Sequence, residues 1–141
     1  MDEQITAQGH EHVTAAHEST LEVTSDDYLT PAGDCIVGIE ADVVPATFDP
    51  DFRAACRNAD ATITATIEVG DHREVVTGRG HPEFTFENER SLVIRTSTYV
   101  DDRTVMVEAD KAATDLDRNL VAALADGAAL SMTLSVDPPN E

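Results

Sequence analysis

The chain has 141 residues with 28 acidic and nine basic side chains, which gives a formal net charge of −19 at pH 7. This length fits one domain, 1–141, and no apolar run approaches the roughly 18 residues of a membrane helix. The acidic start Met1–Gln4 lacks the basic and apolar stretches of a secretory signal, so we expect a cytoplasmic protein with no membrane partner.

Residues 1–70 predict four strands and one helix. Segments rich in β-branched or alternating apolar residues predict strands at 5–9, 20–24, 35–39 and 63–69. Before the last of these strands, Asp49 is a favourable N-cap and Pro50 suits the first helical position. An apolar stripe from Phe52 to Ala59 then predicts a short helix.

Residues 71–141 predict the same order of elements. Strands are expected at 75–79, 92–96, 104–107 and 130–136. Thr114 and Asp117 resemble an acidic capping box before an apolar stripe, and Gly127 suits the helix C-terminus. The proline-containing tail 137–141 is expected to fray.

The two halves also match residue by residue. A shift of 71 positions brings Gly9-His10 onto Gly80-His81, and a shift of 68 brings Glu40-Ala41-Asp42 onto Glu108-Ala109-Asp110. Matching residues in one order with small gaps predict a duplicated unit, with repeats at 5–70 and 76–137.

The expected fold class is mainly β, within the α+β class. Many short strands without intervening helices favour antiparallel pairing. We therefore expect a pseudo-symmetric antiparallel β-sandwich or barrel with two short helices. Each half is too small to bury its own sheet, so we expect that neither folds alone.

Residues present in only one half are candidates for a functional role, because shared residues more often serve the scaffold. Glu83 replaces His12, Asn88 replaces His17, and Cys35 follows a loop without an evident counterpart. The predicted ligand-binding residues, with the shared His10 included, are His10, His17, Asp34 and Cys35.

Imidazole and thiol groups can bind zinc or form a Cys-His catalytic pair. His10, His17 and Cys35 are accordingly the candidate zinc ligands. The alternative is surface histidines near a strand end with a small buried thiol. Cys56 lies on the helix stripe and is interpreted as a packing residue, so both cysteines are expected to be free thiols.

Other charged residues favour structural interpretations. The repeated Glu-Ala-Asp pairs could bind magnesium or calcium, but a solvated strand edge is the favoured interpretation. Four arginines could hold a phosphate or carboxylate, and ion pairs with neighbouring acids are the favoured interpretation: Arg79, Arg90, Arg95 and Arg103.

The acidic surface, with Lys111 as the sole lysine, is typical of adaptation to high salt, where screening reduces self-repulsion. Its charge disfavours a nucleic-acid partner, although high salt weakens this argument.

Two further runs are familiar: Tyr28-Leu29-Thr30-Pro31 with Gly33-Asp34-Cys35-Ile36, and Ala109 to Arg118. With Gly9-His10-Glu11, they resemble an archaeal family known as a domain of unknown function, number three-seven-one. The resemblance implies a compact, mostly β protein of archaeal cytoplasm, here a haloarchaeal-like member, and assigns no catalytic residue.

The sequence thus predicts a small ligand- or partner-binding β module with a His/Cys site in the first repeat. A metal-dependent or Cys-His enzyme acting on a small anion is the alternative. A scaffold subunit of a nucleoprotein complex is a third possibility.

Overall fold

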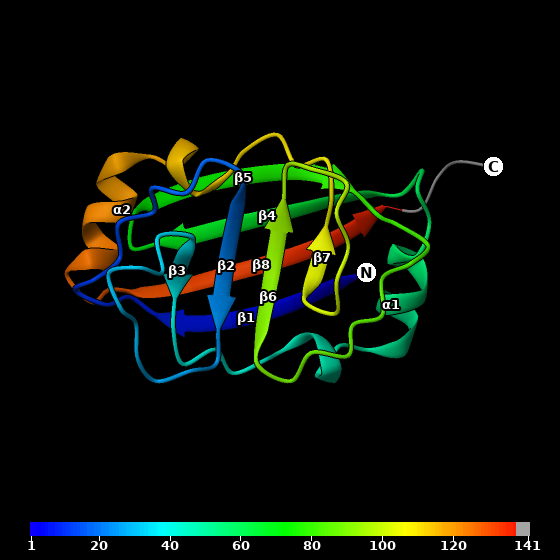
Figure 1. Ribbon diagram of the computed structural model, residues 1–141, viewed down its shortest axis with the longest axis horizontal. Coiled ribbons are helices and arrows are strands. Elements are labelled where there is room, and N and C mark those ends of the chain that lie inside the picture. Colours follow the sequence, from blue (N-terminus) through cyan, green and yellow to red (C-terminus); the bar gives the residue numbers. More distant parts are fainter. Residues whose placement is uncertain (138–141) are drawn as a thin grey trace.

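A computed structural model describes residues 1–137 of the chain (Figure 1). The expected fraying of 138–141 therefore lies outside the described residues. The elements in chain order are β1 (Asp2–Gln8), β2 (Thr20–Thr24), β3 (Ile36–Gly38), α1 (Pro50–Cys56), β4 (Thr62–Val69), β5 (His72–Arg79), β6 (Ser91–Arg95), β7 (Thr104–Met106), α2 (Arg118–Ala125) and β8 (Ala129–Asp137). A short 3₁₀ turn precedes each helix, at Pro45–Thr47 and Ala113–Asp115. Within the described range, no helix is long and apolar enough to cross a membrane.

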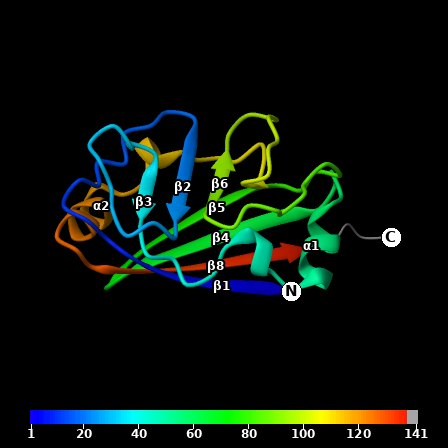
Figure 2. The same cartoon turned by 60° about the horizontal axis from the view of Figure 1, so that its bottom comes forward.

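The strands form two four-stranded sheets that lie one over the other (Figure 2). Sheet A has the order β1-β8-β4-β5, and all its pairs are antiparallel. Sheet B has the order β3-β2-β6-β7, with an antiparallel β2–β6 pair at its centre. Mainly β architecture with two helices is confirmed.

One detail of the expected fold class, the purely antiparallel pairing, is wrong, and one of its two alternatives, the barrel, is excluded. The β2–β3 and β6–β7 pairs are parallel, because the loops 25–35 and 96–103 cross over before the chain re-enters sheet B. The sheets also do not close into a barrel. They are joined outside the named strands by isolated bridges, Gln8 to Ile39 and Arg79 to Val107.

The core lies between the sheets, and the helices cover its two ends (Figure 1). The expected alternation holds in β4 and β8, whose inward residues are buried while their neighbours are partly exposed. The four phenylalanines pack together near α1, with ring centroids 5.6–5.8 Å apart: Phe48, Phe52, Phe84 and Phe86. Edge-to-face contacts of this kind add to the stabilisation from apolar burial.

The helix boundaries follow local capping chemistry. Asp49 caps α1 by accepting from the Asp51 N–H, with Pro50 in the first turn as expected. Asp117, and not Thr114, is the N-cap of α2. Thr114 lies in the preceding 3₁₀ turn, so the capping-box interpretation is corrected. Gly127 ends α2 at a φ of 91°, a conformation that favours glycine.

The two halves of the chain are interlocked. β1 pairs with β8 of the second half, and β5 pairs with β4 of the first. Gly9 lies against the Leu124 carbonyl of α2, where an added Cβ would stand 2.1 Å from the oxygen. Gly80 lies in the same way against the Cys56 carbonyl of α1, at 2.2 Å. Both edges of sheet A therefore depend on strands from the other half.

The Glu-Ala-Asp pairs secure strand edges. The Asp42 carboxylate accepts from the N–H and hydroxyl of Thr6, both at 2.8 Å. Asp110 accepts from the Thr77 N–H at 2.9 Å. These hydrogen bonds, led by the Thr6 N–H, lower the pKa of Asp42 and support the structural interpretation.

Candidate functional site

His10 stabilises a turn after β1. Its Nδ1 accepts from the His12 N–H at 3.0 Å, and the two rings lie 5.1 Å apart. In the second half, the Nδ1 of His81 accepts from the Glu83 N–H at the same distance. The histidine shared by the two halves thus stabilises an equivalent turn in each half.

His17 holds the loop that leads into β2. Its Nδ1 accepts from the N–H groups of Ser19 and Thr20 at 3.2 and 3.1 Å, and it lies 3.0 Å from the Thr20 hydroxyl. An Nδ1 that accepts from amides is unprotonated, so the neutral ring carries its proton on Nε2. The Oδ1 of Asn88 accepts from the two equivalent N–H groups in the second half.

Asp34 joins two loops through its backbone. Its carbonyl accepts from the N–H groups of Ala16 and His17, at 3.0 and 3.2 Å. Cys35 follows, and its carbonyl accepts from the Glu22 N–H at 2.8 Å. The structure thus brings His17, Asp34 and Cys35 into one region.

Cys35 carries a protonated thiol at neutral pH. Burial and then the nearby Glu22 carboxylate raise its pKa to about 11, against a smaller opposing hydrogen bond with Thr20. The Sγ lies 3.8 Å from Glu22 Oε1, the group to which the thiol donates. Because the thiolate is the nucleophilic form, this environment disfavours Cys-His catalysis. Burial raises the pKa of Cys56 still further, to about 12.

Glu22 contacts both the cysteine and a group of arginines on the outer face of sheet B. Arg103 donates to Glu22 Oε1 at 3.5 Å and to Asp101 Oδ2 at 2.9 Å. Arg95 donates to the same Asp101 oxygen at 3.0 Å and to the Thr104 hydroxyl at 2.9 Å. The favoured ion-pair interpretation of Arg95 and Arg103 is confirmed.

Asp101 is held ionised. Hydrogen bonds from Arg103, Thr104 and the Arg103 N–H outweigh the opposing effect of burial and lower the pKa of Asp101 to about 2. Burial alone would lower the pKa of Arg103, but its hydrogen bonds and charge pairing with Asp101 outweigh this effect and raise the pKa. The network therefore holds the loop 96–103 against sheet B.

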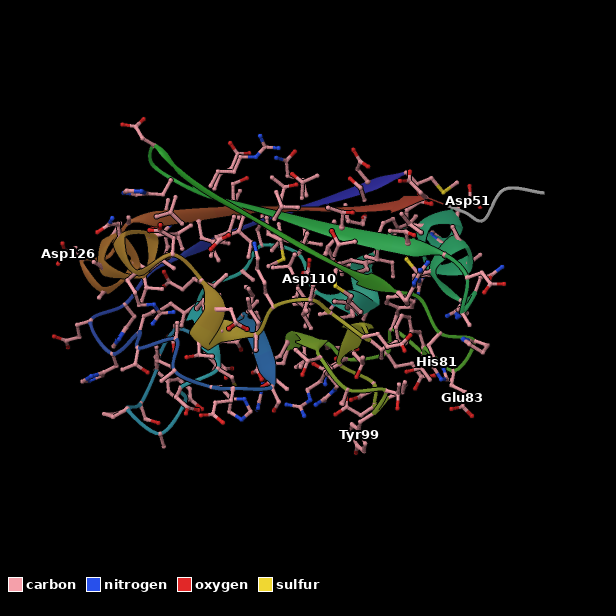
Figure 3. All side chains as sticks on the ribbon, turned by 90° about the horizontal axis from the view of Figure 1, so that it is seen from above. Asp51, His81, Glu83, Tyr99, Asp110 and Asp126 are labelled. Carbon is pink, nitrogen blue, oxygen red and sulfur yellow. The ribbon has the colours of Figure 1, made fainter. Side chains whose placement is uncertain are left out.

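Both tyrosines of the chain lie on the two crossover loops. Tyr28 is 59% exposed and Tyr99 is 61% exposed, whereas every phenylalanine is buried. Figure 3 shows Tyr99 on the side of sheet B that faces away from sheet A. The Arg95 guanidinium stands 4.8 Å from the centre of the Tyr99 ring. Tyr28 follows β2, and Tyr99 follows β6 at the opposite end of this antiparallel pair. We refer to Tyr28, Tyr99, Arg95 and Arg103 together as the tyrosine face.

Sequence reasoning missed most of this network. Glu22 is a buried acid within an apolar strand, and such a residue needs a buried cation or donor as partner. That signal was present in the sequence, but its cationic partner, Arg103, comes from the other half of the chain. The role of Arg118 was equally hidden: its guanidinium donates to five carbonyls, those of Thr14, Ala15, Ala113, Thr114 and Leu116.

The predicted zinc ligands remain a prediction. Among residues 1–137, no three His, Cys, Asp or Glu side chains converge closely enough to hold a metal ion. The His10 ring contacts His12, whereas the side chains of His17 and Cys35 both contact Thr20.

The fold and site define a two-sheet β protein whose polar outer face is closed by two crossover loops. Residues 5–137 match the model of a family described as a domain of unknown function (DUF371), and the chain belongs to that family. It is 40% identical over 132 residues to the uncharacterised protein MJ0206 of Methanocaldococcus jannaschii. The aligned residues cover 94% of this chain and 97% of that protein. The resemblance to this family is thereby confirmed.

Proposed function

We propose that the protein is a partner-binding module that recognises another protein through the tyrosine face. The observation that carries the proposal is the exposure of Tyr28 and Tyr99 at 59% and 61%, on loops tied to sheet B. An exposed aromatic ring contributes little to the fold, but it can bury a large area against a partner at low cost in side-chain entropy.

Charge balance supports a protein partner. Arg95 and Arg103 pair with Asp101 and Glu22, so these four charges cancel on a chain of net charge −19. Protein interfaces are enriched in tyrosine and arginine and depleted of unpaired acids. Tyr28, Tyr99, Arg95 and Arg103 are of the residue types enriched at such interfaces.

Photo-crosslinking tests this proposal. A photoreactive side chain at position 28 or 99 should crosslink one partner at the salt concentration of the source cell. The Tyr28→Ser/Tyr99→Ser variant should lose the same partner in co-purification. Val75, which is 37% exposed on β5, provides the control, since Val75→Ser removes apolar surface from sheet A. Equal recovery of the partner by both variants would overturn the proposal.

A small-ligand site is the second candidate function. His17, Asp34 and Cys35 lie together beside Thr20, whose hydroxyl contacts the His17 ring. Elemental analysis of the purified protein tests whether these residues and His10 hold zinc. Stoichiometric zinc that is lost in the Cys35→Ser variant would support a metal site.

We further propose that the two halves are copies of one unit, related by a two-fold axis between β2 and β6. The same order of elements and the same turn bonds at His10 and His81 support this relation. The high acidity is proposed to be an adaptation to salt. Unfolding temperatures that rise steeply between dilute buffer and molar potassium chloride would support it.

A further inference from the structure

The side of sheet A that faces away from sheet B is an open surface of hydroxyl groups. Along the middle of its two central strands, every outward residue is a partly exposed threonine or serine: Thr62, Thr64, Thr66, Ser131, Thr133 and Ser135. We call these six residues the hydroxyl face. Within the described range, Figure 3 shows no helix or crossover loop over this side of the sheet. Sheet B differs, because its outward Thr24 and Ser91 are only 1% and 2% exposed.

The two edges of sheet A are occupied by the chain itself. On β1 the Thr6 N–H donates to the Asp42 carboxylate, and on β5 the Thr77 N–H donates to that of Asp110. The two isolated bridges to sheet B engage the next outer residues of the same edges. Because little backbone is left there for pairing with a further strand, another chain has to approach the face of the sheet.

The hydroxyl face is complementary to a copy of itself. It is uncharged on a chain of net charge −19, and a hydroxyl both donates and accepts hydrogen bonds, whereas two carboxylate surfaces repel each other. The threonine methyl groups add apolar area, and so does Val75, which is 37% exposed and pairs with Thr66 in the neighbouring strand. A two-fold interface needs this property, because the same patch meets itself.

Charges beside the hydroxyl face select one arrangement of two copies. β5 carries Arg73 and Arg79 on its outward side, and β1 carries Asp2. Asp2 lies in the same row across the sheet as Thr77, one outward residue from Arg79. A two-fold axis parallel to the strands lays β5 of each copy over β1 of the other, so each Arg79 approaches the opposite Asp2. An axis across the strands would lay arginines over arginines.

The area of sheet A is sufficient for such a pair. Four strands about 4.8 Å apart, each about eight residues long at roughly 3.4 Å per residue, cover about 500 Å². Two copies would bury about 1,000 Å² in total, which is the lower end of the range for specific interfaces. Repulsion between two chains of charge −19 is screened beyond about 3 Å in molar salt.

We propose that two copies of this chain form a dimer at high salt, with their A sheets stacked face to face about the axis parallel to the strands. Stacked sheets of this kind lie about 10 Å apart and interdigitate their facing side chains. The tyrosine face belongs to sheet B and stays accessible in this dimer, so the proposal goes beyond the partner-binding function.

Sedimentation equilibrium of the full chain in molar potassium chloride tests the dimer. Wild-type protein should show a reversible equilibrium between 15.1 kDa and twice that mass. Thr133→Asp opposes like charges near the axis and should weaken association at least about tenfold. Thr85→Asp, the same change at an exposed residue outside the strands, should leave association unchanged. A wild-type protein that stays monomeric, or equal association of wild type and Thr133→Asp, would overturn the proposal.

A charge exchange at two exposed residues tests the arrangement without a change in the middle of the sheet. Arg79→Asp should weaken the dimer, and the combination of Arg79→Asp with Asp2→Arg should restore it, because the opposed charges are exchanged. Failure of the second change to restore association would overturn the proposed pairing.

The tyrosine variant separates this dimer from the proposed partner site. Tyr28→Ser/Tyr99→Ser should dimerise like the wild type, because both tyrosines lie on loops of sheet B. Loss of the dimer in that variant would assign self-association to the tyrosine face and would overturn the role of sheet A.

Discussion

His17 and Asn88 perform the same task with different side chains. The Nδ1 of His17 accepts from the backbone N–H groups two and three residues further along, and the Oδ1 of Asn88 does the same in the second half. His17, although no histidine replaces it in the second half, therefore has a structural equivalent there, Asn88. Its presence in one half is weaker support for a ligand role than the sequence comparison indicated.

This relationship predicts that His17→Asn is tolerated. The asparagine supplies the same acceptor, so the free energy of unfolding should change by less than about 0.5 kcal/mol. His17→Ala leaves two N–H groups without their acceptor and should cost about 1–3 kcal/mol. Chemical denaturation in high salt measures both. An equal loss in the two variants would show that the imidazole has a role beyond accepting these bonds.

Cys35 is predicted to react slowly with thiol reagents. Its pKa of about 11 means that the reactive thiolate is scarce near neutral pH, and the labelling rate should rise until the pH approaches that value. Glu22→Gln removes a negative charge that raises this pKa, so labelling at a fixed mildly alkaline pH should accelerate. Fast labelling of wild type at neutral pH would contradict the structure.

The same shift affects stability at alkaline pH. The folded pKa of Cys35 is raised above the ordinary thiol value of 9.0, so its contribution to stability is full below pH 9.0 and is lost as the pH rises through about 11. Cys35→Ala should therefore flatten the decline in unfolding free energy over this range. Denaturation of the two proteins at a series of pH values measures the difference.

Asp101→Asn is predicted to loosen the loop that carries Tyr99. The change leaves Arg95 and Arg103 without their shared carboxylate, and we expect a loss of about 1–3 kcal/mol in unfolding free energy. Asp126→Asn, at an exposed residue after α2, is the matched control and should have little effect. Because the folded pKa of Asp101 is lowered to about 2, the wild-type contribution is full above pH 3.8 and is lost as the pH falls through about 2.

Gly80→Ala is predicted to be severely destabilising. The new Cβ would stand 2.2 Å from the Cys56 carbonyl oxygen and 2.5 Å from that of Asn58, and these backbone atoms cannot rotate away as a side chain could. We expect a loss of about 3 kcal/mol or more in unfolding free energy. Gly70→Ala meets no atom within 4 Å, although its φ of 58° adds strain, so its smaller loss provides the comparison.

Neither half is predicted to fold alone. A fragment of residues 1–70 leaves β1 and β4 without the β8 strand that lies between them in sheet A. Each separate fragment should give the circular dichroism of an unfolded chain, and an equimolar mixture should recover the native spectrum. A folded 1–70 fragment would show that the interlocked strands are not required.

Local chemistry made much of the fold predictable. The alternation of β4 and β8 and the Asp49-Pro50 helix start depend on residues close in sequence, and the structure has them where the pattern predicts. The parallel β2–β3 pair could not be deduced in this way, because its hydrogen bonds depend on the path of a crossover loop.

The sequence by itself determined the secondary structure, the matching order of elements and the family, because periodicity, capping and residue identity are local properties of the chain. The tertiary structure decided which of the candidate residues meet. It joined Cys35 to Glu22 and Glu22 to Arg103, placed Arg95 over the Tyr99 ring, and paired Glu74 with Lys111. Most of these pairings link residues far apart in sequence, and long-range partners are set by how the two sheets pack.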